Sequence, residues 1–310
     1  MRKYAFLLIF SLINMGNFRA QPLNIEGTRT DKALTQKIAD ALKGFHGEVG
    51  VYVRNLRTNR IVEIRADTIF PTASMVKVPI LCGVFDKLSK GELQYDQVLT
   101  YRDSLHYDDG VVGSLRDSAQ IPLPYVLMLM ETLSDNTGSL WMQSLAGGGQ
   151  KINEWLASYG FENTRVNSRT PGRQEAQKTY GWGQTTPREM AELVAMIRAG
   201  KIISPAVSER MYRLLGRQFW DGDGLSQIPP TIQVIAKNGA VNQAKSEVVL
   251  VHAPHGDYVF CITTKNQIDD RWQPDNEGRV LLRTVSRLIW NHYEPKYSWQ
   301  PLEGSSRWQY

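Results

Sequence analysis

Three short polar motifs bring together residue types that can carry out acyl transfer to a serine: Ser74-Met-Val-Lys77, Ser134-Asp-Asn136 and Lys237-Asn-Gly239. A serine hydroxyl is a poor nucleophile at neutral pH and needs a neighbouring base. Residues three apart share one face of a helix, so Ser74 and Lys77 would point into the same space. A lysine in a partly dry site loses its proton more readily, which suits it to act as a base. We therefore expect Ser74 to be the nucleophile and Lys77 its base, although the same pair also occurs at ordinary helix starts.

The second motif lies in a break between two helical patterns, where side chains can reach a cleft. Ser134 would pass a proton to the leaving nitrogen of a substrate. Asn136 carries an amide that can hold Lys77 and a substrate carbonyl, and Asp135 would brace the loop. A polar cap on the helix that follows explains the same residues, and both interpretations can hold together.

The third motif follows an apolar, β-branched run that indicates a strand. Lys237 would attract a substrate carboxylate, the Asn238 amide can also donate to one, and Gly239 lets a ligand or another backbone come close. The backbone N–H of Ala240 would pair with that of Ser74 as an oxyanion hole. An ordinary Asn-Gly turn at a strand end is the alternative interpretation.

The elements that must position these motifs are of two kinds. Runs typical of strands lie near both ends, at 48–55, 60–65, 231–236, 247–252 and 258–264, and helical patterns cover 31–45, 74–88, 124–133, 137–145, 151–159, 186–198 and 276–292. This order predicts an α/β protein of the α+β kind, with an antiparallel sheet built from both chain ends, terminal helices covering it and an all-helical insertion. We expect a sheet subdomain at about 21–68 and 205–310 and a helical subdomain at about 69–204.

Composition indicates a globular protein with a full core. The chain has 310 residues, of which 42% are hydrophobic and 22% charged, and its net charge of +5 is spread without basic runs. Nucleic-acid binding is therefore not expected. We expect a monomer that acts on a small-molecule substrate.

The N-terminus has the order of a secretory signal peptide. Arg2 and Lys3 precede an apolar run at 5–13, and Ala20 offers a plausible cleavage point. The run is too short to span a bilayer as a stable anchor. We expect residues 1–20 to be removed and the mature chain, 21–310, to be periplasmic or secreted.

Metal and cofactor chemistry are not expected. The five histidines form no pair at a metal-binding separation, and the two cysteines, Cys82 and Cys261, lack the neighbours of a catalytic thiol. Both cysteines lie in apolar stretches, so one disulfide and two buried thiols are both open.

In this order the motifs resemble the active-site set of class A β-lactamases and the related penicillin-binding proteins. The segments 70–79 (FPTASMVKVP), 133–138 (LSDNTG) and 185–187 (TTP) are similar to that family, and the similarity runs from about residue 35 to 292. The resemblance implies the β-lactamase/DD-peptidase fold and a β-lactam or peptidoglycan-like substrate. It assigns the nucleophile, base, proton shuttle, positioning amide and carboxylate anchor, in that order, to Ser74, Lys77, Ser134, Asn136 and Lys237.

Two positions depart from the family pattern. Asn238 stands where threonine or serine is usual, and Thr170 stands where the family has the glutamate that activates the deacylating water. Glu175 is the nearest acidic alternative, but its offset is wrong, and an exposed loop carboxylate is the other interpretation. Arg169 and Arg173 in the same loop would suit a different anionic substrate.

Three functions remain open on the sequence. The leading hypothesis is a β-lactamase-type serine hydrolase that forms a Ser74 acyl-enzyme and hydrolyses β-lactams. The second is a slow penicillin-binding or peptidoglycan-directed enzyme of the DD-peptidase type, which acylates but deacylates slowly. The third is a non-catalytic module that binds muropeptides.

Overall fold

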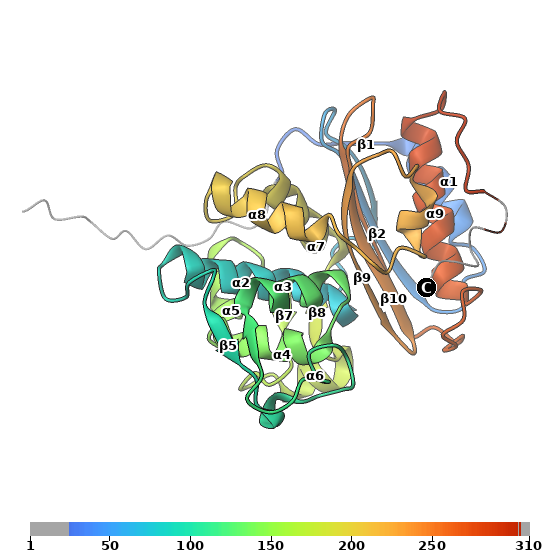
Figure 1. The fold of residues 1–310 in the computed structure, drawn as a ribbon. Coiled ribbons are helices and arrows are strands. Elements are labelled where there is room, and N and C mark those ends of the chain that lie inside the picture. Colours follow the sequence, from blue (N-terminus) through green and yellow to red (C-terminus); the bar gives the residue numbers. More distant parts are fainter. Residues whose placement is uncertain (1–24, 303, 305–310) are drawn as a thin grey trace, which may run out of the picture.

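The protein is built around a sheet with helices on both faces (Figure 1). The computed structural model describes residues 25–302 and 304, so the predicted signal peptide at 1–20 lies outside the described residues. Helices α1 (Lys32–Ala41) and α9 (Glu277–Tyr293), from the two ends of the chain, cover one face of the sheet. Helices from the middle of the chain lie on the other face, and we call them the helical body.

One six-stranded sheet combines strands from both chain ends, in the order β1-β3-β2-β11-β10-β9. The strands are β1 (Arg29–Thr30), β2 (Glu48–Asn55), β3 (Arg60–Ile64), β9 (Val234–Val241), β10 (Ala244–Val251) and β11 (Tyr258–Lys265). All neighbours pair antiparallel except β1 and β3, and the β2–β11 pair joins the N-terminal hairpin to the C-terminal strands. The predicted α+β class, with a sheet built from both chain ends, is confirmed.

The predicted helical insertion lies between β3 and β9. Its helices are α2 (Lys77–Ser89), α3 (Leu123–Thr132), α4 (Asn136–Leu145), α5 (Gly148–Ser158), α6 (Gln174–Tyr180), α7 (Pro187–Arg198) and α8 (Pro205–Leu215). Short strands β4 (Phe70–Pro71), β5 (Val98–Thr100), β6 (Gln120–Pro122), β7 (Arg165–Val166) and β8 (Gly183–Thr185) connect them. No helix in the described part of the chain is long and apolar enough to cross a membrane.

Side chains of the central strands alternate between two hydrophobic cores. In β10, Val249 and Val251 pack with the residues of α1 and α9, whereas Val248 and Leu250 join the core of the helical body. Because both faces are covered, the second half of β10 is a continuous apolar run.

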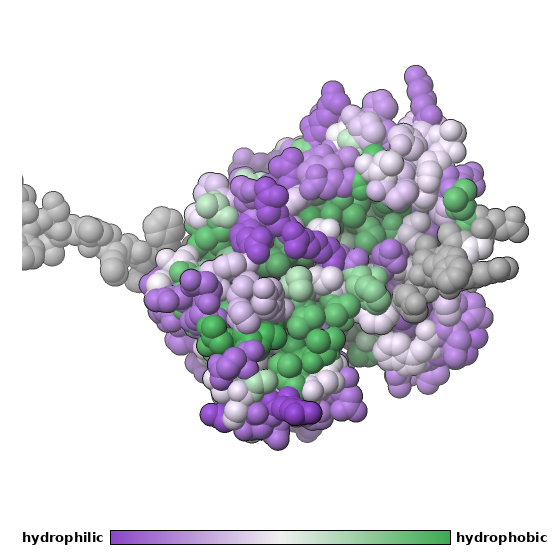
Figure 2. Space-filling view, viewed as in Figure 1, coloured by the Kyte–Doolittle hydropathy of each residue, from purple (hydrophilic) through white to green (hydrophobic). Residues whose placement is uncertain are grey.

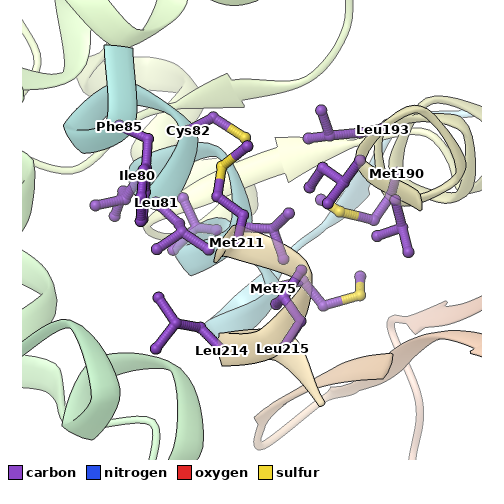
Figure 3. Close-up of a cluster of buried hydrophobic side chains, with 14 of the residues drawn as sticks. Met75, Ile80, Leu81, Cys82, Phe85, Met190, Leu193, Met211, Leu214 and Leu215 are labelled. Atoms are coloured by element: carbon purple, nitrogen blue, oxygen red, sulfur yellow. The ribbon is translucent and has the colours of Figure 1, made fainter. Parts of the chain in front are cut away.

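Helix α2 forms the centre of the helical body and carries the first motif at its start. Every residue of its segment 77–85 is buried. Figure 3 shows Leu81 and Cys82 of α2 beside Met211 of α8, with residues of α7 on the far side of the cluster. Such tight packing restrains the start of α2, and with it the first motif, relative to the rest of the body.

The two cysteines are separate buried thiols. Cys82 lies in α2 and Cys261 in β11, and both are free. Burial raises the pKa of each thiol, so neither is activated as a nucleophile. Of the two interpretations left open by the sequence, the buried thiols are the correct one.

The strand that carries the third motif is longer than predicted. We expected a strand that begins near Thr231 and ends with the motif, but β9 begins at Val234 and continues to Val241. Gly239 pairs with Ser246 of β10, and the turn falls at residues 242–243. The expectation is wrong because β10 pairs with the whole motif, which keeps its Asn-Gly step extended despite the turn preference of that step.

The helical body meets the sheet in two places: α7 packs across β2, β10 and β11, and the turn before α2 approaches the edge strand β9. The space-filling view has a notch at its lower edge between the two parts (Figure 2). On one side of this boundary, β9 contacts the short 3-10 turn Ala73–Val76 that precedes α2. We propose that the chain divides into a sheet subdomain at about 21–68 and 205–310 and a helical subdomain at about 69–204.

Candidate active site

The first motif holds its serine and lysine within hydrogen-bond distance. Ser74 lies in the 3-10 turn Ala73–Val76, and Lys77 is the first residue of α2. The Lys77 side chain is fully buried, and its Nζ donates a hydrogen bond to Ser74 Oγ at 3.0 Å. Ala73 has a φ of 44°, a left-handed conformation that strains the backbone next to Ser74.

The second motif surrounds the same lysine. Lys77 Nζ lies 2.8 Å from the carbonyl oxygen of Ser134, 3.0 Å from Ser134 Oγ and 2.8 Å from Asn136 Oδ1. Ser134 has a φ of 59°, and both its carbonyl and its hydroxyl oxygen face Lys77. Asp135 caps α4 by accepting from the N–H of Gly138 at 2.7 Å, so the capping interpretation holds beside the contacts to Lys77.

The third motif reaches the same serine hydroxyl from the sheet. Lys237 is fully buried in β9, and its Nζ lies 3.2 Å from Ser134 Oγ. It also donates to the carbonyl oxygen and Oδ1 of Asn238, at 3.0 and 3.2 Å. Ser134 Oγ therefore lies between the side-chain nitrogens of two lysines, and while both donate to it, its own proton is available to a third partner.

Gly239 allows β9 to pass against the turn that carries the nucleophile. A Cβ at this position would overlap the carbonyl oxygen of Thr72 and lie 2.9 Å from the backbone nitrogen of Ser74. Ser246 of β10 adds to this contact, with its Oγ 3.2 Å from the carbonyl oxygens of both Thr72 and Gly239. As a result, Ser74 and Ala240, the residue after Gly239, line one cavity.

This cavity has a volume of about 620 Å³ and lies between the helical body and the sheet. Its wall includes the aromatic side chains of Tyr107, Tyr180, Trp182 and Trp272. The rings of Tyr107 and Trp182 pack edge to face, with centroids 4.9 Å apart. Lys265 adds a positive charge, and none of the lining residues in the described part of the chain carries a carboxylate. The cavity therefore suits an anionic substrate that also has apolar or ring-shaped groups.

Burial lowers the pKa of both active-site lysines. Burial, reinforced by the positive charge of Lys237, holds the pKa of Lys77 well below its ordinary value of 10.5. Burial also lowers the pKa of Lys237 to about 8. Lys77 can therefore take up the proton of Ser74, while Lys237 keeps its charge up to mildly alkaline pH.

The loop between α5 and α7 brings no carboxylate to the cavity. Thr170, which stands where the family has its deacylating glutamate, is buried, donates to the Ser168 carbonyl at 3.0 Å and packs against Gly149. Glu175 lies in α6, where its side chain is 85% exposed and forms an ion pair with Lys178 at 2.7 Å. Neither residue lines the cavity, and the exposed, paired side chain of Glu175 supports the interpretation of a loop carboxylate on the surface.

The two arginines of this loop are also outside the cavity lining. Arg173 donates to Asn167 Oδ1 at 2.8 Å and to Gln184 Oε1 at 2.6 Å, and so braces the loop itself. Arg169 is exposed to solvent. Their positions do not support a role in recognising an anionic substrate in this cavity.

Two residues from remote segments belong to the site and were not predicted. Asp108 Oδ2 accepts from Asn136 Nδ2 at 2.7 Å, which orients that amide so that its oxygen faces Lys77. The ring centroid of Trp182 lies 6.0 Å from Lys77 Nζ. Neither residue stands in a local pattern that could have identified it.

A third residue of the site had a signal in the sequence. Glu131 ends the apolar run 126–131 (VLMLME), three residues before Ser134, and its side chain is fully buried. Glutamate is almost never fully buried unless it is paired. Its charge acts on both Lys77 and Lys237, which makes it part of the same electrostatic cluster.

Comparisons with known sequences agree with this geometry. A profile of the beta-lactamase enzyme family matches residues 33–293. Beta-lactamase VEB-1 of Pseudomonas aeruginosa is 21% identical over 272 residues, which cover 84% of this chain and 90% of that enzyme. A beta-lactamase of Bacillus licheniformis is 25% identical over 277 residues, which cover 84% of this chain and 85% of that enzyme.

Solved structures share the fold over most of the chain. PBP-A matches with a TM-score of 0.77 and 26% identity, over 89% of this chain and 99% of PBP-A. A PBP-A mutant solved as an acyl-enzyme complex with penicillin G matches with a TM-score of 0.76 and 26% identity, over 86% of this chain and 98% of the mutant. The beta-lactamase of Sphaerobacter thermophilus, at 21% identity and a TM-score of 0.74 over 84% of this chain and 96% of its own, shows a likeness of fold alone. Since the family profile spans most of the chain, the protein belongs to the beta-lactamase enzyme family.

Proposed function

We propose that this family hydrolase forms a covalent acyl-enzyme through Ser74 with β-lactams and with the peptides of peptidoglycan, and that it releases the acyl group slowly. The observation that carries the proposal is one connected set of hydrogen bonds, in which Lys77 joins Ser74 to Ser134 and Ser134 joins Lys77 to Lys237. These groups come from the 3-10 turn Ala73–Val76, α2, the α3–α4 loop and β9, and Ser74 and Asn136 line the cavity. A binding module without catalysis would have no need for this arrangement.

The hydrogen bonds support a complete path for the proton during acylation. Neutral Lys77 takes the proton of Ser74 across 3.0 Å, and Ser74 Oγ bonds to the substrate carbonyl carbon. The backbone N–H groups of Ser74 and Ala240 stabilise the oxyanion. Lys77 then passes its proton to Ser134, 3.0 Å away, as Ser134 gives its own to the leaving nitrogen when the C–N bond breaks. Lys237 holds the substrate carboxylate.

Hydrolysis of the acyl-enzyme requires a second step for which the site lacks a group. A water molecule must be deprotonated before it attacks the ester, and a carboxylate is the usual base. The cavity lining in the described part of the chain has no carboxylate, and Trp182 occupies part of the wall near Lys77. The geometry thus favours the slow penicillin-binding, peptidoglycan-directed hypothesis over rapid β-lactam turnover.

The lifetime of a benzylpenicillin adduct distinguishes the hypotheses. After mixing with benzylpenicillin, intact mass spectrometry is expected to find one adduct with the full mass of the drug, mapped to Ser74 by peptide digestion, which persists long after free drug is removed. Ser74→Ala, the matched control, should form none. Rapid turnover without a persistent adduct would establish a true β-lactamase instead, and no adduct together with muropeptide binding would establish the non-catalytic module.

Replacing Glu175 is expected to leave deacylation unchanged. Glu175→Gln removes a carboxylate that is exposed and forms an ion pair with its neighbour Lys178. Such surface substitutions usually change free energies by less than about 0.5 kcal/mol, or about twofold in rate. The rate of adduct loss, followed by intact mass, should match that of Glu154→Gln, which removes a similar exposed partner of Lys151. A much longer-lived adduct in Glu175→Gln alone would identify Glu175 as the base.

We further propose that the mature protein acts as a monomer in the periplasm or outside the cell. The charged and apolar order of residues 1–20 supports export, and peptidoglycan lies in the compartment that such a signal reaches.

A further inference from the structure

Glu131 is a buried carboxyl group that the proposed acylation path does not use. It lies in the last turn of α3, three residues before Ser134, and none of its surface is exposed. Neither Oε1 nor Oε2 has a hydrogen-bond partner in the described part of the chain. A buried carboxylate without partners is costly, so its presence beside an active site calls for a physical reason.

The charges that act on Glu131 are those of the two active-site lysines. Burial raises the pKa of Glu131 to about 7, whereas the charges of Lys237 in β9 and Lys77 in α2 favour the ionised carboxylate. The thiol of Cys82 in α2 also faces it and stays neutral because burial raises its pKa. Other carboxylates act on single members of the cluster: Asp108 and Asp135 act on Lys77, and Glu247 acts on Lys237.

The proposed chemistry needs the two lysines in opposite states. Lys77 must be neutral to take the proton of Ser74, while Lys237 must be charged to hold the substrate carboxylate. Both are fully buried and both contact Ser134 Oγ, so they differ little in burial. One buried negative charge can balance one ammonium but not two, which leaves the second lysine to lose its proton.

We propose that Glu131 is a positioning residue, the buried counter-charge that keeps Lys237 protonated while Lys77 is neutral. It never touches the substrate and acts only through the charges of the two lysines. The inference rests on the proposed acylation by Ser74 and names the group that sets the pH range of that reaction.

The pH profile of acylation tests this role. In the wild-type protein, the second-order rate constant for acylation by benzylpenicillin should rise as Lys77 loses its proton and fall again near pH 8, where Lys237 loses its charge. In Glu131→Gln the charge that raises both lysine pKa values is gone. The rising limb and the falling limb of the pH profile should then both move to lower pH by about one unit or more. On the alkaline side, the acylation rate should fall about tenfold as a result.

Two variants separate charge from structure. Glu131→Asp keeps the carboxylate and should restore the wild-type limbs even if its rate is lower. Glu192→Gln removes another buried carboxyl with a raised pKa. Glu192 lies in α7 and accepts hydrogen bonds from Tyr52 and Arg54 of β2. It should lower stability without moving either limb.

A measurement on the wild-type protein covers the case in which Glu131→Gln does not fold. The methyl ester of benzylpenicillin has no carboxylate for Lys237 to bind, so its alkaline limb should be weakened or absent. Three results would each overturn this inference. They are the same alkaline limb for the acid and the ester, unshifted limbs in a folded Glu131→Gln, and a shift that Glu131→Asp does not reverse. Failure of the wild-type protein to acylate at all would instead overturn the proposed function.

Discussion

Lys77→Met is expected to lower the rate of Ser74 acylation by about a hundredfold to ten-thousandfold, the usual contribution of a positioned general base. Methionine fills a similar volume but can neither accept the proton of Ser74 nor pass one to Ser134. In the wild-type protein both hydroxyl oxygens lie 3.0 Å from Lys77 Nζ. The measurement is the second-order rate constant for the benzylpenicillin adduct, read by intact mass over time.

The control for this substitution is Lys151→Met, at an exposed lysine of α5 that pairs with Glu154. It should acylate at the wild-type rate. Circular dichroism at the assay temperature checks that Lys77→Met is folded, since the loss of Nζ leaves the Ser134 carbonyl and Asn136 Oδ1 without this donor. If the folded Lys77→Met variant acylated within tenfold of wild type, another group would have to be the base.

Gly239→Ala is expected to lower acylation by about a hundredfold to a thousandfold, the effect of losing one oxyanion donor. The added Cβ would overlap the carbonyl oxygen of Thr72 and crowd the backbone nitrogen of Ser74. Both are backbone atoms, so either β9 or the nucleophile's turn must move, and the N–H groups of Ser74 and Ala240 would no longer point to one place. Such overpacking typically also destabilises a protein by about 1–3 kcal/mol.

A matched glycine separates this local effect from the general effect of glycine replacement. Gly216 ends α8 with a φ of −80°, and a Cβ there would have no neighbour closer than 3.6 Å. Gly216→Ala should therefore keep both the acylation rate and the melting temperature. Wild-type acylation by a folded Gly239→Ala would show that the close approach of β9 is not needed for the oxyanion hole.

Most of the fold could be predicted because it depends on short-range patterns. The strand runs near 48–55 and 258–264 and the helical patterns between them follow from the spacing of apolar residues, and the structure has these elements with small shifts at their ends. The error at β9 had a different origin. The Asn238–Gly239 step prefers a turn locally, but its pairing with β10 holds it extended, and that pairing depends on a segment the local pattern does not include.

The residues of the three motifs in the candidate site could be predicted from the sequence, but the residues that surround them could not. Ser74, Lys77 and Ser134 could be named because their residue types and order suit acyl transfer, and the structure places the hydroxyl oxygens of both serines 3.0 Å from Lys77 Nζ. Asp108 and Trp182 could not be named, since each reaches the site by tertiary contact alone.

The sequence by itself determined which groups can act and the order of the elements that carry them, because both follow from residue type and from local periodicity. Only the tertiary structure decided that Glu131 is buried where its charge acts on Lys77 and Lys237 and that Glu175 lies away from the cavity. The physical reason is that pKa values and hydrogen bonds depend on burial and on charges from distant segments, which the packing of the whole chain brings together.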